Sequence, residues 1–406
     1  MINVIGQGYI GLPTALMLAK NGNKVVGTDH NKKLIESLQK GLLTFKEKGL
    51  DLLFKEANNN GIQFSTEYQE TDTYIISVPT PYLKKGKKMD PTYVISAVES
   101  VLDICRKDSI LIIESTISPG SIDRYIRPTI TKKGYVIGKD IHLAHAPERI
   151  IPGNMIHELE NNSRTIGVDN YKIGNIVKSL YSSFCKGEIT VTDIRTAEMS
   201  KVVENTYRDI NIAFANELAK ICRADNMDVY RIIDIANRHP RVNILQPGPG
   251  VGGHCISVDP WFLVGDYPDL TNLIMTARKI NDSMPTFVLS RIRDIMVEYG
   301  LKDISKVGLY GLTYKENVDD TRESPTLQML EIMEEHLAFG IKVFDPFVKE
   351  KIIEHQFMNF DDFIKDIDIV VIMIAHDHII QNMDSIKNKI IIDTRNICDF
   401  DGVHKL

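Results

Sequence analysis

The sequence predicts an α/β protein in which two doubly wound domains are joined by a long helical segment. Short apolar strands alternate with helical segments near both ends of the chain, and an uninterrupted helical pattern separates these two regions. Strands that alternate with helices indicate parallel sheets. The chain has 406 residues, more than a single hydrophobic core usually accommodates, and this length also favours several domains.

The N-terminal region supplies the first predicted sheet. Between its strands lie segments with helical spacing, such as Leu12–Lys20 and Tyr93–Leu102. The strands are expected at Met1–Ile5, Lys24–Thr28, Thr73–Val78, Ile110–Glu114 and Ile141–His145.

The middle of the chain changes to a helical pattern. A long helix is expected from Thr196 to about Ala236, where the sequence has no Gly or Pro, and a second helical stretch covers Thr271–Tyr299. The second α/β domain follows, with strands expected at Lys306–Tyr310, Lys342–Phe344, Ile367–Ile374 and Lys389–Asp393.

Composition excludes several classes of protein. The net charge of −6 argues against a nucleic-acid partner or an anionic membrane surface, because both select for basic proteins. The sequence has no apolar run long enough to span a membrane and no recognisable signal peptide, so a cytoplasmic protein is expected. The five cysteines are scattered and form no CxxC pair, which predicts reduced thiols and no bound metal.

A glycine motif suggests a dinucleotide site. Gly6, Gly8 and Gly11 form GxGxxG between a predicted strand and a predicted helix, the context in which the motif binds a pyrophosphate at the helix N-terminus. Asp29 ends the next strand, where an acidic residue accepts hydrogen bonds from the adenosine ribose. A carboxylate there repels the extra phosphate of NADP, so NAD is the predicted cofactor.

Two threonines lie just beyond later strands of the same sheet. Thr80 in VPTP and Thr116 in ESTISPG are therefore expected at the edge of the sheet where ligands bind. Taken alone, either residue could instead cap a helix.

A reactive thiol is predicted in the block PGPGVGGHCISVDP. Cys255 lies in glycine-rich backbone, with His254 beside it and Asp259 four residues later. A thiolate adds readily to an aldehyde, and the resulting thiohemiacetal can lose a second hydride. The residues alone also allow a buried structural thiol, or a zinc site that includes His254 and Asp259, although a matching second ligand cluster is missing.

Three polar residues share one face of the predicted long helix. Lys201 and Asn205 are separated by four positions and Arg208 follows three later. A lysine and an amide in this arrangement could stabilise a developing alkoxide. Spacing alone favours the simpler interpretation, a solvated polar stripe.

Taken together, these blocks resemble the UDP-glucose and UDP-N-acetylmannosamine 6-dehydrogenases over essentially the whole chain. The matching blocks, in order, are GQGYIG, VPTP, ESTISPG, APERI, EMSKVVENTYRDINIAFANELAK, PGPGVGGHCISVDP and YKENVDDTRESP. The resemblance implies an N-terminal Rossmann domain for NAD at residues 1–190, a central long-helix domain that forms a homodimer at 191–295, and a C-terminal Rossmann-like domain that holds UDP at 296–406.

The resemblance also implies roles for individual residues. The catalytic group comprises Cys255 as nucleophile, Lys201, Asn205 and Asp259 around the C6 oxygen and a water, and Glu148 for thioester hydrolysis. The cofactor contacts are Gly6, Gly8, Tyr9, Ile10, Gly11, Asp29, Thr80, Thr116 and Arg322. The substrate contacts are Arg149, Ile150, Lys201, Asn205, Arg208, His239, Arg241, Gly252, Tyr314 and Lys315, and the resemblance allows Arg241 to act across the dimer.

The implied reaction oxidises the C6 alcohol of a UDP-sugar twice. An aldehyde forms first, Cys255 captures it, and the thioester that follows is hydrolysed, so that two NAD are reduced per sugar. The proton of the alcohol is taken by Lys201 or by a water that Lys201 and Asp259 hold.

The run HPRVNILQPGPGVGGHCISVDPWF is most similar to the branch that forms N-acetylmannosaminuronate, so UDP-N-acetyl-D-mannosamine is the expected substrate. UDP-N-acetylglucosamine and UDP-glucose are the alternatives, and Ser257 departs from the usual Pro or Ala of relatives. A catalytically silent protein that binds NAD or nucleotide sugars is the alternative from another class.

Overall fold

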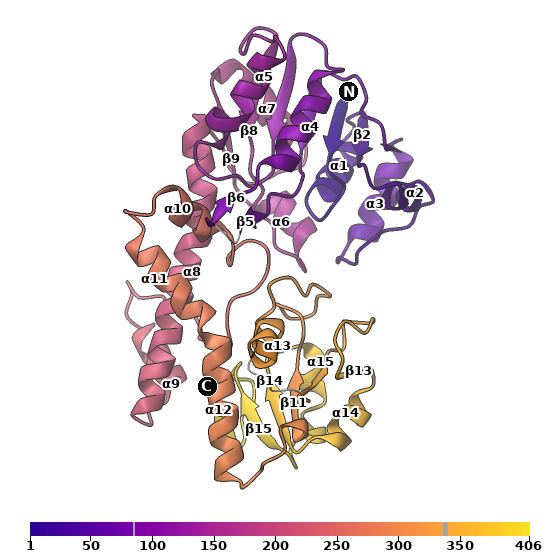
Figure 1. Cartoon of the computed structure of the whole chain (residues 1–406). Coiled ribbons are helices and arrows are strands. Elements are labelled where there is room, and N and C mark those ends of the chain that lie inside the picture. The colour runs from indigo at the N-terminus through magenta and orange to yellow at the C-terminus, as the bar shows by residue number, and fades with distance from the viewer. Residues whose placement is uncertain (84–85, 336–339) are drawn as a thin grey trace. The chain divides into compact units, whose positions relative to one another are not determined.

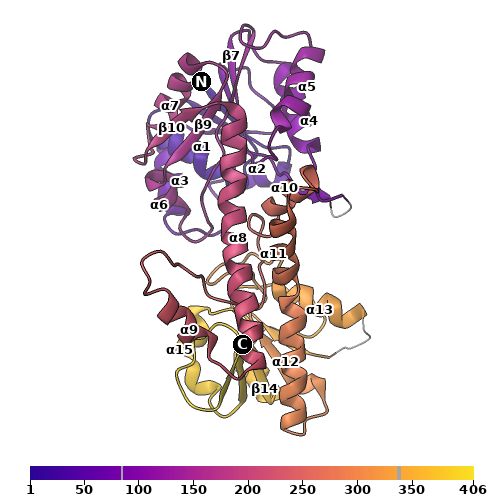
Figure 2. The same cartoon turned by 90° about the vertical axis from the view of Figure 1, so that its left-hand side faces the viewer.

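The computed structural model describes residues 1–83, 86–335 and 340–406, and the chain forms two compact units, Met1–Glu204 and Asn205–Leu406. The helix α8 (Ile194–Ala224) begins in the first unit and ends in the second (Figure 2). Each unit contains its own β-sheet with helices packed against it (Figure 1).

The first unit is built on a sheet of eight strands. In spatial order these are β10 (Ile189–Thr192), β9 (Arg164–Val168), β8 (Ile141–His145), β7 (Ser109–Ile113), β4 (Thr73–Ile76), β1 (Ile2–Ile5), β2 (Val25–Thr28) and β3 (Gln63–Ser65). Its helices are α1 (Gly11–Lys20), α2 (Lys32–Gln39), α3 (Leu50–Asn59), α4 (Thr92–Leu102), η1 (Ile122–Ile126), α5 (Arg127–Lys132), α6 (Met155–Asn161) and α7 (Tyr171–Tyr181). A small ribbon pairs β5 (Tyr82–Leu83) with β6 (Lys88–Met89). The five predicted strands are confirmed to within two residues at each end.

One pair of strands in this sheet departs from the prediction of a parallel sheet. Strands β8 and β9 are antiparallel, with Ala144 opposite Val168 and His145 opposite Gly167. The connection between them, which includes α6, therefore leaves and re-enters the sheet at the edge where β8 ends. The APERI segment and Arg164, the first residue of β9, are both held at this carboxyl edge.

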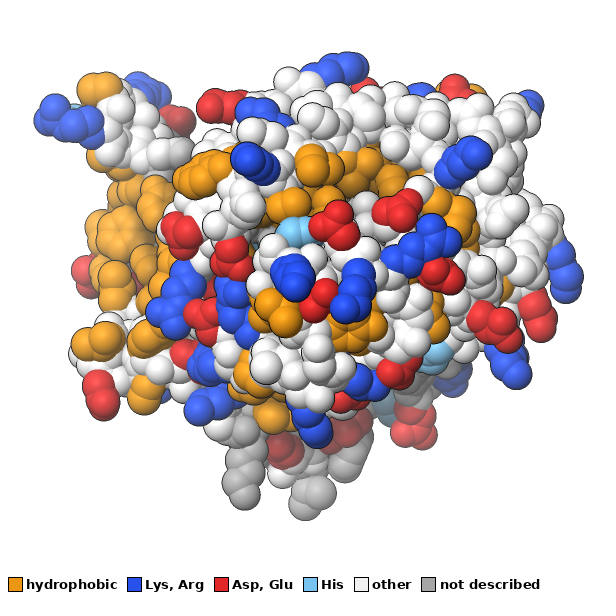
Figure 3. Space-filling model, turned by 90° about the horizontal axis from the view of Figure 1, so that it is seen from above, with side chains coloured by type: hydrophobic (Ala, Val, Ile, Leu, Met, Phe, Trp, Pro, Cys, Tyr) orange, Lys and Arg blue, Asp and Glu red, His pale blue; other side chains and the backbone are white. Residues whose placement is uncertain are grey.

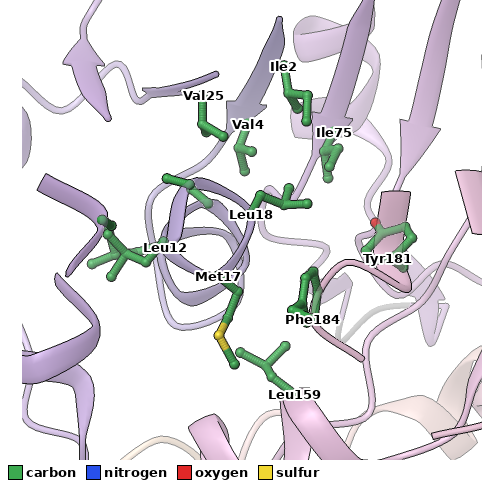
Figure 4. Packing of buried hydrophobic residues seen from close by; sticks show 14 of the residues in the cluster. Ile2, Val4, Leu12, Met17, Leu18, Val25, Ile75, Leu159, Tyr181 and Phe184 are labelled. Carbon is green, nitrogen blue, oxygen red and sulfur yellow. The ribbon is translucent and has the colours of Figure 1, made fainter. Parts of the chain in front are cut away.

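The core of the first unit lies between α1 and the sheet. Leu12, Met17 and Leu18 of α1 are fully buried, and they pack with buried residues of the strands such as Val4 and Ile75 (Figure 4). Burial of each such side chain contributes roughly 1.5–3 kcal/mol. This packing fixes the start of α1, and with it the glycine turn, against the carboxyl end of β1.

The second unit is built on a parallel sheet of six strands. In spatial order these are β13 (Gln356–Phe357), β12 (Lys342–Phe344), β11 (Val307–Tyr310), β14 (Ile369–Ile372), β15 (Ile390–Asp393) and β16 (Val403–Lys405). Its helices after α8 are α9 (Val229–Ala236), α10 (Asp259–Asp266), α11 (Asn272–Asp282), α12 (Met284–Glu298), η2 (Ile304–Lys306), α13 (Pro325–Glu335), α14 (Phe360–Asp366), α15 (Asp377–Gln381) and η3 (Met383–Ser385). One hydrophobic core joins α8, α12 and the sheet through residues such as Ala219, Ile292 and Leu309.

One predicted long helix is wrong in its extent, and one predicted helical stretch contains two helices. The stretch from Thr196 to Ala236 divides into α8 and α9, because Asn226 adopts a left-handed φ of +53° and the Asp228 carboxylate caps α9. The stretch Thr271–Tyr299 divides into α11 and α12, and Pro285 occupies the first turn of the second helix.

In the part of the chain that the structure describes, no helix is long and apolar enough to cross a membrane. On the face shown in Figure 3, acidic and basic side chains are interspersed rather than gathered by sign.

Candidate active site

A glycine turn joins β1 to α1 at the carboxyl edge of the first sheet. Gly6 has a φ of +91°, and a Cβ on it would lie 2.4 Å from the Ser77 carbonyl oxygen. A Cβ on Gly11 would lie 1.8 Å from the Gly6 carbonyl oxygen. A Cβ on Gly8, in contrast, meets no atom within 4 Å. Gly8 therefore exposes its backbone as a pyrophosphate requires, and the turn fits the predicted NAD.

Asp29 lies directly after β2 and faces this turn. Its carboxylate accepts hydrogen bonds from the backbone N–H groups of Gln7 at 2.8 Å and Asn31 at 2.9 Å. The side chain is 13% exposed. Each carboxylate oxygen can accept a further bond, so Asp29 fits the predicted contact with the ribose hydroxyls.

Four other residues predicted to contact NAD lie around the same edge, namely Tyr9, Ile10, Thr80 and Thr116, whereas the predicted contact Arg322 belongs to the second unit. Tyr9 stacks on Phe45, with ring centroids 4.4 Å apart, and Ile10 is the N-cap residue of α1. The Thr80 hydroxyl donates to the Thr116 carbonyl oxygen at 2.6 Å and so ties together the loops that follow β4 and β7.

Glu148 and Ile150 follow β8 at this edge, and both are buried. The Arg164 guanidinium is bound to the Glu148 carboxylate, which also accepts a 2.6 Å bond from the Arg149 backbone N–H. The ion pair fixes the carboxylate predicted to act in thioester hydrolysis.

Arg149 was predicted to contact the substrate, and its guanidinium already has protein partners. It lies 2.7 Å from the Glu204 carboxylate and donates to the Thr165 hydroxyl at 2.9 Å and to Ser163. The residue therefore also holds the APERI segment in place.

The helical residues predicted to surround the C6 oxygen differ in burial. Lys201 and Asn205 lie one turn apart on α8 and are each 6% exposed, whereas Arg208 is exposed. In the second unit the Asn205 amide donates to the buried Asp259 carboxylate at 2.6 Å. A solvated polar stripe is therefore the wrong description of Lys201 and Asn205.

Cys255 is exposed in the turn that leads into α10. Its carbonyl oxygen accepts hydrogen bonds from the Val258 and Asp259 N–H groups at 3.0 and 2.8 Å. The Ser257 hydroxyl donates to the Gly253 carbonyl oxygen, and this hydrogen bond stabilises the loop itself. The alternative of a buried structural thiol is wrong, because the Cys255 side chain is accessible to a substrate.

The glycines before Cys255 pack against the segment after β11. A Cβ on Gly252 would lie 2.5 Å from the Glu323 carbonyl oxygen, and one on Gly253 would lie 2.7 Å from the Tyr314 ring. The Gly253 N–H also donates to the Arg322 carbonyl oxygen at 3.0 Å. Predicted site residues from two separate blocks are thus brought together, Gly252 in the Cys255 loop and Tyr314 and Arg322 after β11.

Charged side chains set the electrostatics of this loop. The Arg322 guanidinium pairs with the Asp320 carboxylate, with Nη2 2.6 Å from Oδ2. Burial and the nearby Arg322 charge lower the pKa of His254, so its imidazole is neutral near pH 7. The backbone carbonyl of Lys315 accepts a 2.9 Å bond from Thr313, which fixes that turn.

Sequence reasoning missed one cation in this region, Arg395. It follows β15 by two residues, and its Nη2 lies 2.5 Å from the Glu316 carboxylate. Its Nη1 would lie 3.0 Å from a Cβ placed on Gly248. The signal was available, because a cation directly after a predicted strand lies at the edge of the sheet where anionic ligands bind.

His239 and Arg241 lie in the segment after α9. Both side chains are exposed, and the Arg241 N–H donates to His239 Nδ1 at 3.3 Å. Within the described ranges, no group of three or more His, Cys, Asp or Glu side chains is arranged to hold a metal ion.

Three profiles of one family cover nearly the whole chain. The NAD binding domain matches residues 1–185, the central domain residues 195–283 and the UDP binding domain residues 308–400. The chain belongs to the UDP-glucose/GDP-mannose dehydrogenase family. The predicted family, the three-domain α/β architecture and the NAD cofactor are confirmed, and the chain is an NAD-dependent dehydrogenase.

Individual relatives of this dehydrogenase share its full length. The UDP-N-acetyl-D-mannosamine dehydrogenase of Methanocaldococcus jannaschii is 45% identical, over 98% of this chain and 92% of the relative. The NDP-N-acetyl-D-galactosaminuronic acid dehydrogenase of Ralstonia nicotianae is 38% identical, over 98% of this chain and 96% of the relative. The solved UDP-N-acetyl-mannosamine dehydrogenase of Staphylococcus aureus has a TM-score of 0.89 and 40% identity, over 100% of this chain and 97% of that chain.

Proposed function

We propose that this dehydrogenase oxidises C6 of UDP-N-acetyl-D-mannosamine to a carboxylate, through a covalent intermediate on Cys255 and with two NAD reduced per sugar. The observation that carries the proposal is the exposed Cys255 in a glycine-rich turn that leads directly to Asp259, which is buried and bonded to Asn205. Relatives of 42–45% identity that are named for this substrate support the choice of sugar.

The protein residues act in three successive steps. Lys201 takes the proton of the C6 hydroxyl, directly or through a water, while the Asn205–Asp259 pair fixes the C6 oxygen. Cys255 then adds to the aldehyde carbon and holds it as a thiohemiacetal. Glu148 assists the water that hydrolyses the thioester. Bound NAD would supply the acceptor for the hydride that each oxidation releases.

The UDP moiety is assigned to the carboxyl edge of the second sheet. Tyr314 and Lys315 follow β11, and Arg395 follows β15, so two cations lie at the ends of two strands of this sheet. A guanidinium matches the geometry of phosphate oxygens and Lys315 adds a second positive charge. Arg208 and Gly252 remain predicted contacts to the substrate, and His239 and Arg241 remain predicted to lie near the sugar.

Replacing Arg395 with alanine should raise KM for the UDP-sugar by about tenfold to a hundredfold, because a charge-assisted hydrogen bond contributes roughly 1.5–3 kcal/mol. Arg395→Lys should restore part of the loss. Steady-state kinetics of both variants measure the effect, with Arg293→Ala, an exposed arginine of α12, as the control. An Arg395→Ala enzyme with an unchanged KM would exclude Arg395 from the nucleotide site.

The choice of sugar is tested by comparing kcat/KM for several nucleotide sugars. The proposal predicts the highest value with UDP-N-acetyl-D-mannosamine. UDP-N-acetylglucosamine, UDP-N-acetylgalactosamine and UDP-glucose are the competitors, and the galactosamine sugar is included because of the Ralstonia relative. A higher kcat/KM with any competitor would replace the proposed substrate and leave the reaction unchanged.

We also propose that the chain forms a homodimer through α8. Tyr207, Phe214 and Ile221 recur every seven residues on this helix and are 64%, 50% and 51% exposed. Large apolar side chains repeating at this interval form a stripe that another helix can cover.

The domain boundaries predicted from the sequence, 1–190, 191–295 and 296–406, stay proposals.

Phe214→Glu should convert the dimer to a monomer, because it places a charge in the centre of this stripe. Sedimentation measures the mass, with Tyr171→Glu, a change at another exposed aromatic residue, as the control.

Mixing inactive Cys255→Ser and Arg241→Ala subunits tests whether Arg241 acts across the dimer. If it does, a mixed dimer contains one site with both an intact Cys255 and an intact Arg241, and activity returns. Activity that does not return on mixing would place Arg241 in its own subunit's site.

A further inference from the structure

Two carboxyl groups and one guanidinium form a buried cluster at the carboxyl edge of the first sheet. Glu114 directly follows β7, Glu148 follows β8, and Arg164 begins β9. Their side chains are 0%, 4% and 4% exposed. Arg164 is bound to Glu148 through Nη2, while its Nη1 lies 3.7 Å from Glu114 Oε1. One cation therefore serves two carboxyl groups.

Apart from Arg164 and Glu148, the named neighbours of Glu114 are polar but uncharged. Ser77 donates to Oε2 at 2.5 Å, the Tyr181 phenol donates to Oε1 at 3.0 Å, and Thr14 of α1 lies 3.4 Å from Oε1. On the other side, the Arg164 guanidinium lies over the rings of Tyr181 and Phe184, with its Cζ 4.5 and 5.2 Å from their centroids. The Cys185 thiol is a further titratable group near Arg164.

The charges in this cluster do not balance if both carboxyl groups are ionised. Burial raises the pKa of Glu114 to about 7, the Glu148 charge adds to the increase, and Arg164, Ser77 and Tyr181 oppose it. Arg164 Nη1 has no hydrogen-bond partner and lies 3.7 Å from Glu114 Oε1, so the guanidinium is bound to Glu148 more closely than to Glu114. Glu114 thus retains its proton up to about neutral pH.

We propose that Glu114 is a positioning residue for Glu148: Glu114 holds a proton in the buried cluster, and Glu148 acts as the base of thioester hydrolysis only after Glu114 has lost that proton. This inference rests on the role proposed for Glu148.

The proton transfer from water to Glu148 explains why Glu114 must first be ionised. In hydrolysis the water oxygen bonds to the thioester carbon, the water proton passes to Glu148, and the C–S bond breaks with its electron pair on the Cys255 sulfur. If Glu114 were still protonated, this would leave two neutral carboxyl groups beside an unpaired, buried Arg164, which is unfavourable. If Glu114 is ionised, the same transfer restores the state with one proton. Hydrolysis should therefore accelerate as pH rises through about 7 and level off above it.

The kinetic test follows the decay of the Cys255 thioester in single turnovers between pH 5.5 and 9, by intact mass after acid quench. The wild type should show the rise near pH 7. Glu114→Gln, which cannot ionise, should lose this rise and hydrolyse at least tenfold more slowly at pH 8. Tyr181→Phe removes one donor to the Glu114 carboxylate and should move the rise upward by about one pH unit.

Tyr74→Phe is the matched control, because Tyr74 is equally buried and its hydroxyl bonds to Thr71 instead of Glu114. It should leave the midpoint unchanged even if it lowers stability. A Tyr181→Phe midpoint equal to that of the wild type would overturn the proposal, since a purely structural role predicts that result.

A second readout does not depend on activity. The infrared carbonyl band of a protonated carboxyl group should disappear in the wild type as pH rises through about 7 and should be absent in Glu114→Gln. If no such band titrates, a proton on Glu114 is excluded and the proposal fails. If the band titrates but no thioester forms on Cys255, the proposed reaction fails instead, and Glu114 then has no hydrolysis to control.

Discussion

Replacing Cys255 with serine should lower the formation of uronate by about 10³-fold or more, the scale observed when an enzyme loses its nucleophile. The serine hydroxyl is a far weaker nucleophile near neutral pH than a thiolate, so the aldehyde is not captured and the second oxidation has no thiohemiacetal to act on. Because Cys255 is exposed and lies in a turn, the substitution should leave folding unchanged.

The measurement is the amount of uronate formed per enzyme, together with the Kd for NAD. Cys105→Ser provides the control, since Cys105 lies in the first unit and belongs to no predicted site. Uronate formation within tenfold of the wild type would remove Cys255 from the mechanism. A silent binding protein would form no uronate with or without the substitution.

The second large effect is expected at the glycine turn, where two glycines should respond in opposite ways. Gly11→Ala should destabilise the protein by about 3 kcal/mol or more, because the new Cβ would lie 1.8 Å from the Gly6 carbonyl oxygen. Gly8→Ala should fold normally, because its Cβ meets no protein atom within 4 Å. The same Cβ would occupy the approach of the pyrophosphate, so Gly8→Ala should bind NAD at least about tenfold more weakly.

Thermal unfolding and calorimetric titration with NAD separate the two effects. A Gly8→Ala protein that binds NAD as tightly as the wild type would show that the pyrophosphate does not approach Gly8. A Gly11→Ala protein with wild-type stability would contradict the close packing of Gly11 against the Gly6 carbonyl oxygen.

Local patterns in the sequence were sufficient for much of the fold. Strands such as Ile141–His145 and Lys342–Phe344 have the predicted bounds, since short apolar runs between turns leave few other possibilities. The break between α8 and α9 could not be predicted from apolar periodicity, because it depends on one left-handed residue, Asn226. The antiparallel β9 was not predicted either, since its direction is set by tertiary pairing.

In the candidate site, too, features within one stretch of sequence were predicted and contacts between distant segments were not. The glycine turn was predicted because its chemistry lies within one stretch of sequence. The packing of Gly253 against Tyr314 and the position of Arg395 beside Gly248 join segments about 60 to 150 residues apart, which spacing cannot reveal. Arg164 lies near Glu114 because β9 enters the sheet at its carboxyl edge. This contact could not be predicted from the sequence, because the direction of β9 was not predicted.

The measurement that tests the central claim most directly is the number of NADH molecules formed for each molecule of UDP-N-acetyl-D-mannosamine consumed by the purified enzyme. The proposed mechanism predicts two NADH and one uronate per sugar, because the aldehyde stays bound to Cys255 until the second oxidation. One NADH per sugar with release of an aldehyde would contradict the covalent four-electron mechanism.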